Sequence, residues 1–195
     1  MDGLLIDWGG VLTHSVLGSF AAFDEAEGLP ENTIRDAFLN DARPLLEGLE
    51  SGELSLSQFE QQLAQHLDLD QTNLAARLMA HARPDEEMRE AVRRFHDQGI
   101  RTVLVSNSWR ESDYDMADAF DAMVLSQQAG IRKPDPRIYQ VALEKVELPP
   151  HRCVFVDDLG GNLKPAEQLG MTTIKHVCAE TTISELERVL HPRPS

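Results

Sequence analysis

Residues 4–13 read Leu4-Leu5-Ile6-Asp7-Trp8-Gly9-Gly10-Val11-Leu12-Thr13. A short apolar run, typical of a buried strand, ends at an aspartate, and a glycine-rich loop follows at once. In such a loop the backbone can approach a ligand closely, and an acid at the end of a strand lies at the mouth of a sheet. We therefore expect Asp7 to take part in chemistry, whereas a lone aspartate in this position would by default cap a turn.

From residue 87 onward the sequence alternates between helix and strand patterns. Strands are expected over residues 100–105, 123–125, 153–156 and 172–174, with helices starting near residues 87, 136 and 163 between them. A capping-box pattern over residues 182–185 predicts the start of a last helix. This alternation predicts a doubly wound α/β fold, with a mostly parallel sheet and helices on both faces.

Residues 15–84 interrupt the alternation, because they carry helical patterns and no convincing strand. A second capping-box pattern, over residues 57–60, predicts the start of one of these helices. A helical insertion after the first strand is expected to form a small α-helical cap over the carboxyl edge of the sheet. The expected organisation is a core of residues 1–14 and 85–195 with a cap of residues 15–84.

Composition excludes several classes of protein. The formal net charge of −15 over 195 residues argues against nucleic acid and anionic membranes as partners. No apolar run approaches a membrane span, and the N-terminus lacks a signal-peptide pattern. Cys153 and Cys178 both lie in apolar surroundings, so we expect them to be reduced core residues of a cytoplasmic protein. An anionic substrate would need local help from a metal, a lysine or helix N-termini.

The first strand has three later counterparts with polar residues suited to phosphate chemistry, namely Ser106-Asn107, Lys133 and Asp157-Asp158. The carboxyl ends of adjacent strands in an open α/β sheet converge on one crevice, so distant residues can meet there. A carboxylate nucleophile can accept a phosphoryl group, while a lysine and a serine hydroxyl can hold its oxygens. Paired carboxylates are hard oxygen ligands of the kind that Mg²⁺ prefers.

These stretches resemble the four motifs of the haloacid dehalogenase-like (HAD) hydrolase superfamily, in the phosphatase-type branch with a helical cap after the first strand (subfamily IA). The matching residues are Asp7–Leu12, Val103–Asn107, Arg132–Pro136 with Ile138 and Tyr139, and Phe155–Asp158 with Asn162, Ala166 and Gly170-Met171. The match spans nearly the whole chain. Four motifs in the right order are far more specific than any one of them.

The resemblance implies a Rossmann-like core and Mg²⁺-dependent hydrolysis of a small phosphate monoester, such as a sugar phosphate, through a phosphoaspartyl intermediate on Asp7. The implied partner is a small phosphorylated metabolite, bound by a monomer or a homodimer. The implied site comprises Asp7, Ser106 and Lys133 in catalysis, Gly10 and Asn107 in substrate binding, Asp157 and Asn162 behind them, and Asp7, the Gly9 carbonyl and Asp158 as Mg²⁺ ligands.

Gly9 departs from the family pattern, because most phosphatases of the family carry a second aspartate there as the general acid and base. That help is typically worth roughly 10²–10⁴-fold in rate. A substrate with a good leaving group, such as a sugar 1-phosphate or acyl phosphate, would depend on it less, and Thr13 or His14 could substitute. The departure keeps two alternatives open: a metal-free 2-haloacid dehalogenase, and a weakened member that binds a phosphorylated ligand or a protein. The acidic pair after the fourth strand favours the metal-dependent phosphatase.

Four other side chains each have two interpretations. Trp109 and Arg110 directly follow the second motif, and they either face the crevice or start a helix on the surface. Arg43 and Glu47 lie in the expected cap. They either contact the substrate or are solvated charges.

Overall fold

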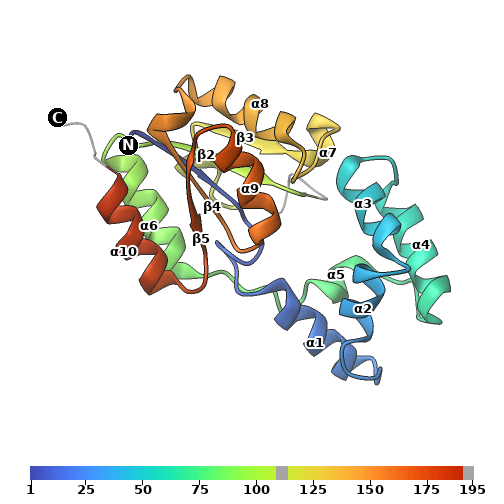
Figure 1. The fold of residues 1–195 in the computed structure, drawn as a ribbon. Coiled ribbons are helices and arrows are strands. Elements are labelled where there is room, and N and C mark those ends of the chain that lie inside the picture. Colours follow the sequence, from blue (N-terminus) through green and yellow to red (C-terminus); the bar gives the residue numbers. More distant parts are fainter. Residues whose placement is uncertain (109–113, 191–195) are drawn as a thin grey trace.

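The computed structural model describes residues 1–108 and 114–190, and its centre is a five-stranded parallel sheet (Figure 1). The strands lie in the order β3-β2-β1-β4-β5. Their bounds are Gly3–Ile6 for β1, Arg101–Ser106 for β2, Ala122–Leu125 for β3, Cys153–Asp157 for β4 and Thr172–Lys175 for β5. β1 pairs with β2 on one side and with β4 on the other. The doubly wound α/β fold expected from the sequence is confirmed.

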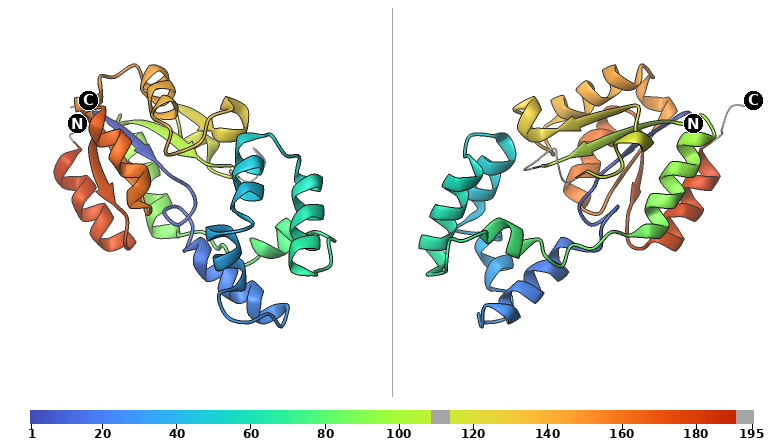
Figure 2. Two further views of the ribbon diagram at one scale, coloured as in Figure 1. Left: turned by 45° about the vertical axis from the view of Figure 1, so that its right-hand side comes forward. Right: turned by 180° about the vertical axis from the view of Figure 1, so that it is seen from behind.

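Helices cover both faces of the sheet (Figures 1 and 2). On one face lie α6 (Glu86–Asp97) and α10 (Ala179–Val189), and on the other α8 (Pro136–Val146) and α9 (Gly160–Gln168). β1 is buried from both sides: Leu4 and Ile6 pack under α6 and α10, whereas Leu5 packs under α8 and α9. Because successive side chains alternate between faces, a doubly covered strand must be apolar throughout, as the first strand is.

A helical unit with its own apolar core lies beside the sheet (Figure 2). It comprises α1 (Val16–Ala26), α2 (Thr33–Leu39), α3 (Arg43–Ser51), α4 (Leu56–Leu67) and α5 (Leu74–Leu78), and is called the α1–α5 unit below. Two stretches of chain join it to the sheet, and they run side by side where Thr13 and Pro84 form an antiparallel bridge. A second contact is made by α3, which packs against the short helix α7 (Ser126–Ala129). Within the described residues, no helix is long and apolar enough to cross a membrane.

The last helix begins earlier than its sequence pattern predicts. α10 starts at Ala179, and Thr182 lies buried within it, where its hydroxyl pairs with His176 Nδ1 at 3.0 Å. The expected cap residue is therefore used for packing against the end of β5. The expectation for the cysteines is correct for Cys153, which is buried, and wrong for Cys178, which is exposed just before α10.

The capping box of α4 lies two residues before the expected one. The Ser55 hydroxyl accepts a hydrogen bond from the Gln58 N–H at 3.3 Å, and Gln58 Oε1 accepts one from the Ser55 N–H at 2.9 Å. The sequence offers two overlapping serine patterns here. Ser55 has the extended backbone that an N-cap residue needs, whereas Ser57 already lies within α4, so only Ser55 forms the reciprocal pair.

Candidate active site

Asp7 lies directly after β1, at the carboxyl edge of the sheet. Its N–H continues the pairing with β4 by donating to the Val156 carbonyl at 3.0 Å, and its side chain is nearly buried. Asp7 Oδ1 accepts a hydrogen bond from the Trp8 N–H at 2.7 Å. The backbone of Trp8, the first residue of the glycine-rich loop, therefore holds the Asp7 carboxylate.

Gly10 brings this loop close to the end of β4. Its φ is +76°, a left-handed conformation that glycine adopts without strain. A Cβ atom at this position would lie 2.5 Å from Asp158 Oδ2. The Gly10 N–H donates to Thr13 Oγ1 at 3.1 Å, which closes the loop on itself. Glycine is required at position 10 both by the backbone and by the neighbouring carboxylate.

Three carboxylates meet at this edge. Asp7, Asp157 and Asp158 each offer an oxygen atom, and these atoms all lie within 4.8 Å of one another. Asp157 ends β4 and is fully buried, and both of its oxygens accept hydrogen bonds from Asn162 Nδ2 at 3.0 Å. Asp157 Oδ1 also accepts one from the Leu159 N–H at 2.8 Å. Asp157 is thus held in place by hydrogen bonds from Asn162 and the Leu159 backbone.

Lys133 is the positive charge of the cluster. It lies in the loop before α8, only 1% exposed, with Nζ 2.7 Å from Asp7 Oδ1 and 2.7 Å from Asp157 Oδ2. Burial by itself lowers the pKa of Lys133, but the two carboxylates outweigh it and raise the pKa above its ordinary value. The lysine therefore stays charged and bridges the ends of β1 and β4.

One ammonium does not neutralise three carboxylates. Burial, together with the charges of Asp157 and Asp158, raises the pKa of Asp7 to about 8, although Lys133 opposes the shift. Burial and Asp157 likewise raise the pKa of Asp158 to about 6. Such a set of hard oxygen donors with surplus negative charge fits a divalent cation such as Mg²⁺, which would favour the ionised carboxylates.

Ser106 and Asn107 lie at the end of β2, next to the same edge. The nearly buried Ser106 hydroxyl accepts a hydrogen bond from the Tyr114 hydroxyl at 3.1 Å. Asn107 Oδ1 accepts one from the Lys133 N–H at 2.8 Å, and Asn107 Nδ2 donates to the Lys133 carbonyl at 3.1 Å. Nδ2 also donates to Glu50 Oε2 of α3 at 3.3 Å. The side chain expected to bind substrate is thus engaged with protein groups.

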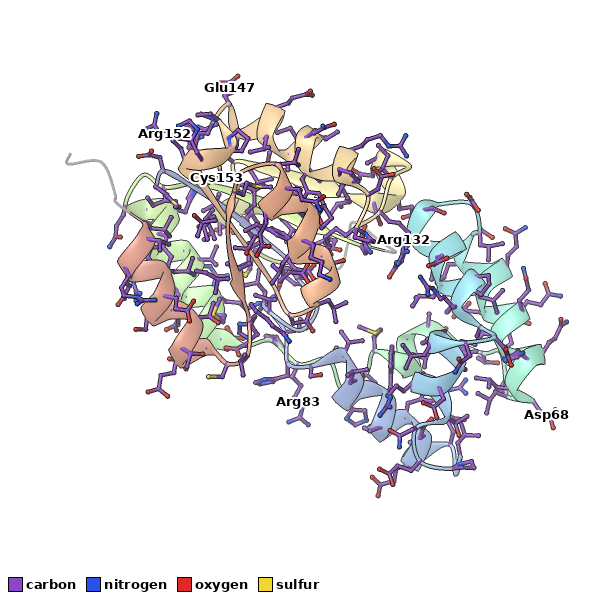
Figure 3. All side chains as sticks on the ribbon, viewed as in Figure 1. Asp68, Arg83, Arg132, Glu147, Arg152 and Cys153 are labelled. Carbon is purple, nitrogen blue, oxygen red and sulfur yellow. The ribbon has the colours of Figure 1, made fainter. Side chains whose placement is uncertain are left out.

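Sequence reasoning missed Tyr114, Glu50 and the role of Arg132. Arg132 lies inside the third motif-like stretch, and its guanidinium reaches across to α3 (Figure 3), where it pairs with Glu50 at 2.7 Å and Glu47 at 3.1 Å. The only available signal was the position of Arg132 beside Lys133. Arg43, weighed as a substrate contact, pairs instead with Glu47 at 2.9 Å and is largely exposed.

The structure thus brings most of the expected site residues together at one edge of the sheet, from β1, β2, β4 and the loop before α8. Gly9 lies two residues after Asp7 in the loop after β1. Thr13 uses its hydroxyl within the loop, donating to the His14 carbonyl at 3.1 Å, and the His14 side chain is exposed. Trp109 and Arg110 lie outside the described residues.

Known proteins share this sequence pattern and fold. A family model for haloacid dehalogenase-like hydrolases matches residues 1–170. The chain belongs to this family. It is therefore a hydrolase of the HAD superfamily, as its four motifs predict.

Among curated relatives, the chain is 30% identical to acyl-CoA dehydrogenase family member 10 of Mus musculus, over 96% of this chain and 19% of that protein. It is 29% identical to bifunctional epoxide hydrolase 2 of Mus musculus, over 94% of this chain and 38% of that protein. The chain thus spans about a fifth and about two fifths of these relatives. It is also 27% identical to a sesquiterpene phosphatase of Aspergillus oryzae, over 74% of this chain and 78% of that protein.

Solved structures have the same fold. A HAD-like family hydrolase from Porphyromonas gingivalis superposes with a TM-score of 0.76 at 23% identity, covering 100% of this chain and 99% of that one. A HAD family enzyme from Bacteroides thetaiotaomicron, in complex with magnesium and inorganic phosphate, gives 0.70 at 20% identity, covering 91% and 94%. The L-2-haloacid dehalogenase of Xanthobacter autotrophicus, with chloropropionic acid covalently bound, gives 0.67 at 18%, covering 98% and 85%. At these identities the likeness shows the fold.

Proposed function

We propose that this HAD hydrolase is a Mg²⁺-dependent phosphatase that hydrolyses a small phosphate monoester through a phosphoaspartyl intermediate on Asp7. One observation carries the proposal: Lys133 Nζ lies 2.7 Å from both Asp7 and Asp157, and the Asp158 carboxylate belongs to the same cluster. A nucleophile, a buried cation and spare carboxylates for a metal are the parts that phosphoryl transfer needs.

In the first step a carboxylate oxygen of Asp7 attacks phosphorus, a bond forms between them, and the bond from phosphorus to the leaving oxygen breaks. Lys133 neutralises charge beside Asp7, and Asp157 together with Asn162 holds Lys133 in place. The Ser106 hydroxyl donates to a phosphoryl oxygen. In the second step water attacks the phosphorus, the bond to the aspartate oxygen breaks, and inorganic phosphate leaves.

Mg²⁺ would be held by Asp7, Asp158 and the Gly9 carbonyl. The bound ion supplies positive charge against the transferring phosphoryl group. Burial, together with the charges of Asp157 and Asp158, raises the pKa of Asp7 to about 8, and this surplus of buried negative charge supports the assignment. The magnesium and phosphate complex of the Bacteroides thetaiotaomicron enzyme and the sesquiterpene phosphatase relative support the same chemistry.

The α1–α5 unit, between about residues 15 and 84, acts in this proposal as a cap that closes over the site and selects the substrate. Because Gly9 supplies no acid, the leaving oxygen takes its proton from water or from the substrate's surroundings. Substrates with good leaving groups, such as sugar 1-phosphates and acyl phosphates, are therefore favoured. Gly10 and the backbone around Asn107 would contact the phosphoryl group.

The test is hydrolysis of para-nitrophenyl phosphate by the wild type and the Asp7→Asn variant, each with Mg²⁺ or with EDTA. The proposal predicts turnover that requires Mg²⁺ and is lost in the variant. Absence of turnover by folded wild type with Mg²⁺ would overturn it.

Gly9 favours a second candidate, metal-free hydrolysis of a 2-haloacid, because family dehalogenases resemble this chain in lacking the second aspartate. The Asp157-Asp158 pair opposes it, since adjacent carboxylates beside Asp7 repel one another without a cation. Chloride release from 2-chloropropionate in the presence of EDTA separates the two activities. Release at enzymatic rates without metal would replace the phosphatase proposal.

A further inference from the structure

Glu50 lies in α3 of the α1–α5 unit, yet its carboxylate is directed at residues of the sheet and of the loop before α8, and its side chain is only 12% exposed. Glu50 Oε2 accepts hydrogen bonds from Arg132 Nε at 2.8 Å and from Asn107 Nδ2 at 3.3 Å. Arg132 and Asn107 are neighbours of the cluster around Lys133. One carboxylate from the helical unit thus contacts two of the segments that build the site.

The main chain of Glu50 makes a separate anchor. Its carbonyl accepts a hydrogen bond from Ser126 Oγ at 2.6 Å, and Ser126 Oγ accepts one from the Ser108 N–H at 3.0 Å. All three groups are buried. Because this anchor uses only the backbone of residue 50, it should survive any change of that side chain.

The Glu50 carboxylate is connected to Asp7 through Asn107 and then through the backbone and side chain of Lys133. Asn107 Nδ2 donates both to Glu50 Oε2 at 3.3 Å and to the Lys133 carbonyl at 3.1 Å, while Asn107 Oδ1 accepts from the Lys133 N–H at 2.8 Å. Lys133 Nζ then lies 2.7 Å from Asp7. Without Glu50 only the two bonds to the Lys133 backbone hold this amide, so we expect Asn107 to be less firmly oriented and its pairing with Lys133 to open more often.

We propose that Glu50 is a positioning residue, which fixes Asn107 and through it the backbone of Lys133 when the α1–α5 unit is docked on the sheet. The proposal deepens the phosphatase function and rests on it for its kinetic consequence only. Docking of the helical unit and placement of the catalytic lysine are thereby coupled. Glu47, which contacts Arg132 but not Asn107, lies outside this path.

The direct test is amide exchange in the ¹⁵N-labelled full chain with Glu50→Met, a variant in which Arg132 keeps Glu47 as a partner. The Lys133 N–H reports on Asn107, and the Ser108 N–H reports on the main-chain anchor. We expect the Lys133 amide to exchange about tenfold faster, because its acceptor Asn107 is held less firmly, while the Ser108 amide stays protected. Glu47→Gln is the matched control and should change neither amide.

Kinetics give the second readout. Glu50→Met should lower kcat for para-nitrophenyl phosphate roughly 10- to 100-fold, the usual cost of losing a partner behind a catalytic group, with a smaller change in KM. Glu50→Gln keeps an oxygen that can accept from Asn107, so it should recover most of that loss. Glu47→Gln should remain within about twofold of the wild type.

The outcomes separate this inference from the phosphatase proposal. Faster exchange of both the Lys133 and the Ser108 amides would mean that Glu50 merely holds the α1–α5 unit on the sheet. Unchanged exchange of the Lys133 amide would mean that Glu50 does not position Lys133 through Asn107. Either result overturns the inference, as would wild-type kcat in folded Glu50→Met. If the wild type does not hydrolyse phosphate esters at all, the proposed function fails, while the exchange of the Lys133 amide still decides the role of Glu50.

Discussion

At the scale of single residues, Gly9 is the position where this chain departs from family phosphatases, and a side chain there requires a small shift of Val16. A Cβ atom there would meet only Val16 Cγ2, at 3.3 Å. We predict that Gly9→Asp raises kcat/KM for alkyl phosphates, by up to roughly 10²–10⁴-fold, because the new acid protonates a poor leaving group. Para-nitrophenyl phosphate, whose leaving group needs no proton, should gain far less.

Gly10→Ala is the matched comparison in the same loop. Its Cβ would lie 2.5 Å from Asp158 Oδ2 on a backbone with φ of +76°, so we expect loss of turnover and weaker Mg²⁺ binding. Steady-state kinetics on both substrates check the pair. If Gly9→Asp instead abolishes all turnover, the loop is built around glycine at position 9 as well, and the account of a missing acid is wrong.

Lys133 should also contribute to the stability of the fold. Lys133→Met would leave Asp7 and Asp157 buried without a cation, which typically costs about 3–5 kcal/mol of unfolding free energy. Urea unfolding in EDTA at neutral pH measures the loss. Lys164→Met, at an exposed position on α9, should change stability by less than about 0.5 kcal/mol. Equal stability of the two variants would show that the buried ion pair is dispensable.

At the scale of an element, β1 depends on close packing at its first residue. A Cβ atom at Gly3 would lie 2.8 Å from Cys153 Sγ on β4 and 2.9 Å from Leu148 Cδ1. Gly3→Ala should therefore lower the unfolding free energy by about 1–3 kcal/mol. At the exposed Gly18 in α1, an added Cβ atom would have no neighbour within 4 Å, so Gly18→Ala should raise the unfolding free energy by about 0.5–1 kcal/mol. Denaturant midpoints of the two variants should move in opposite directions, and a stabilising Gly3→Ala would contradict the packing.

At the junction of β5 and α10, His176 should make the stability of the protein depend on pH. The buried ring of His176 pairs with Thr182, and burial lowers the pKa of His176 below its ordinary value of 6.5, although Asp85 opposes the shift. The folded state therefore favours the neutral ring, so this contribution to stability is complete above pH 6.5 and is lost as the pH falls from 6.5 toward the lowered pKa. His176→Gln should lose less stability than wild type between pH 7.5 and 5.5, whereas exposed His66→Gln should follow the wild type.

At the scale of the whole molecule, the three carboxylates join the ends of β1 and β4, so a cation bound there should stabilise the entire sheet. Mg²⁺ at about 100 times its Kd would add roughly 2.7 kcal/mol, or about 5–10 °C in Tm for a chain of this size. Thermal unfolding with Mg²⁺ and with EDTA measures the shift. Asp158→Asn should abolish it, and an undiminished shift in that variant would place the cation elsewhere.

The sequence was sufficient to predict the parallel sheet, the helices on both faces and the meeting of Asp7, Lys133, Asp157 and Asp158. Hydrophobic periodicity marks the strands and most of the helices locally, although α3 and α7 had no predicted counterpart, and parallel strands must bring their carboxyl ends to one edge. Element boundaries were less predictable. A capping-box pattern can occur by chance within a helix, and the one at Thr182 does, because α10 already begins at Ala179.

Only the tertiary structure decided that Glu50 belongs with Asn107 and Arg132, and that the Tyr114 hydroxyl meets Ser106. A charged residue on an amphipathic helix has the same local pattern whether it faces solvent or a partner far along the chain. The approach of α3 to the loop before α8 depends on how two separate apolar cores are joined, and no periodicity within either one records it. The chemistry of the strand ends was therefore determined by the sequence, and the connection between that chemistry and the helical unit by the packing.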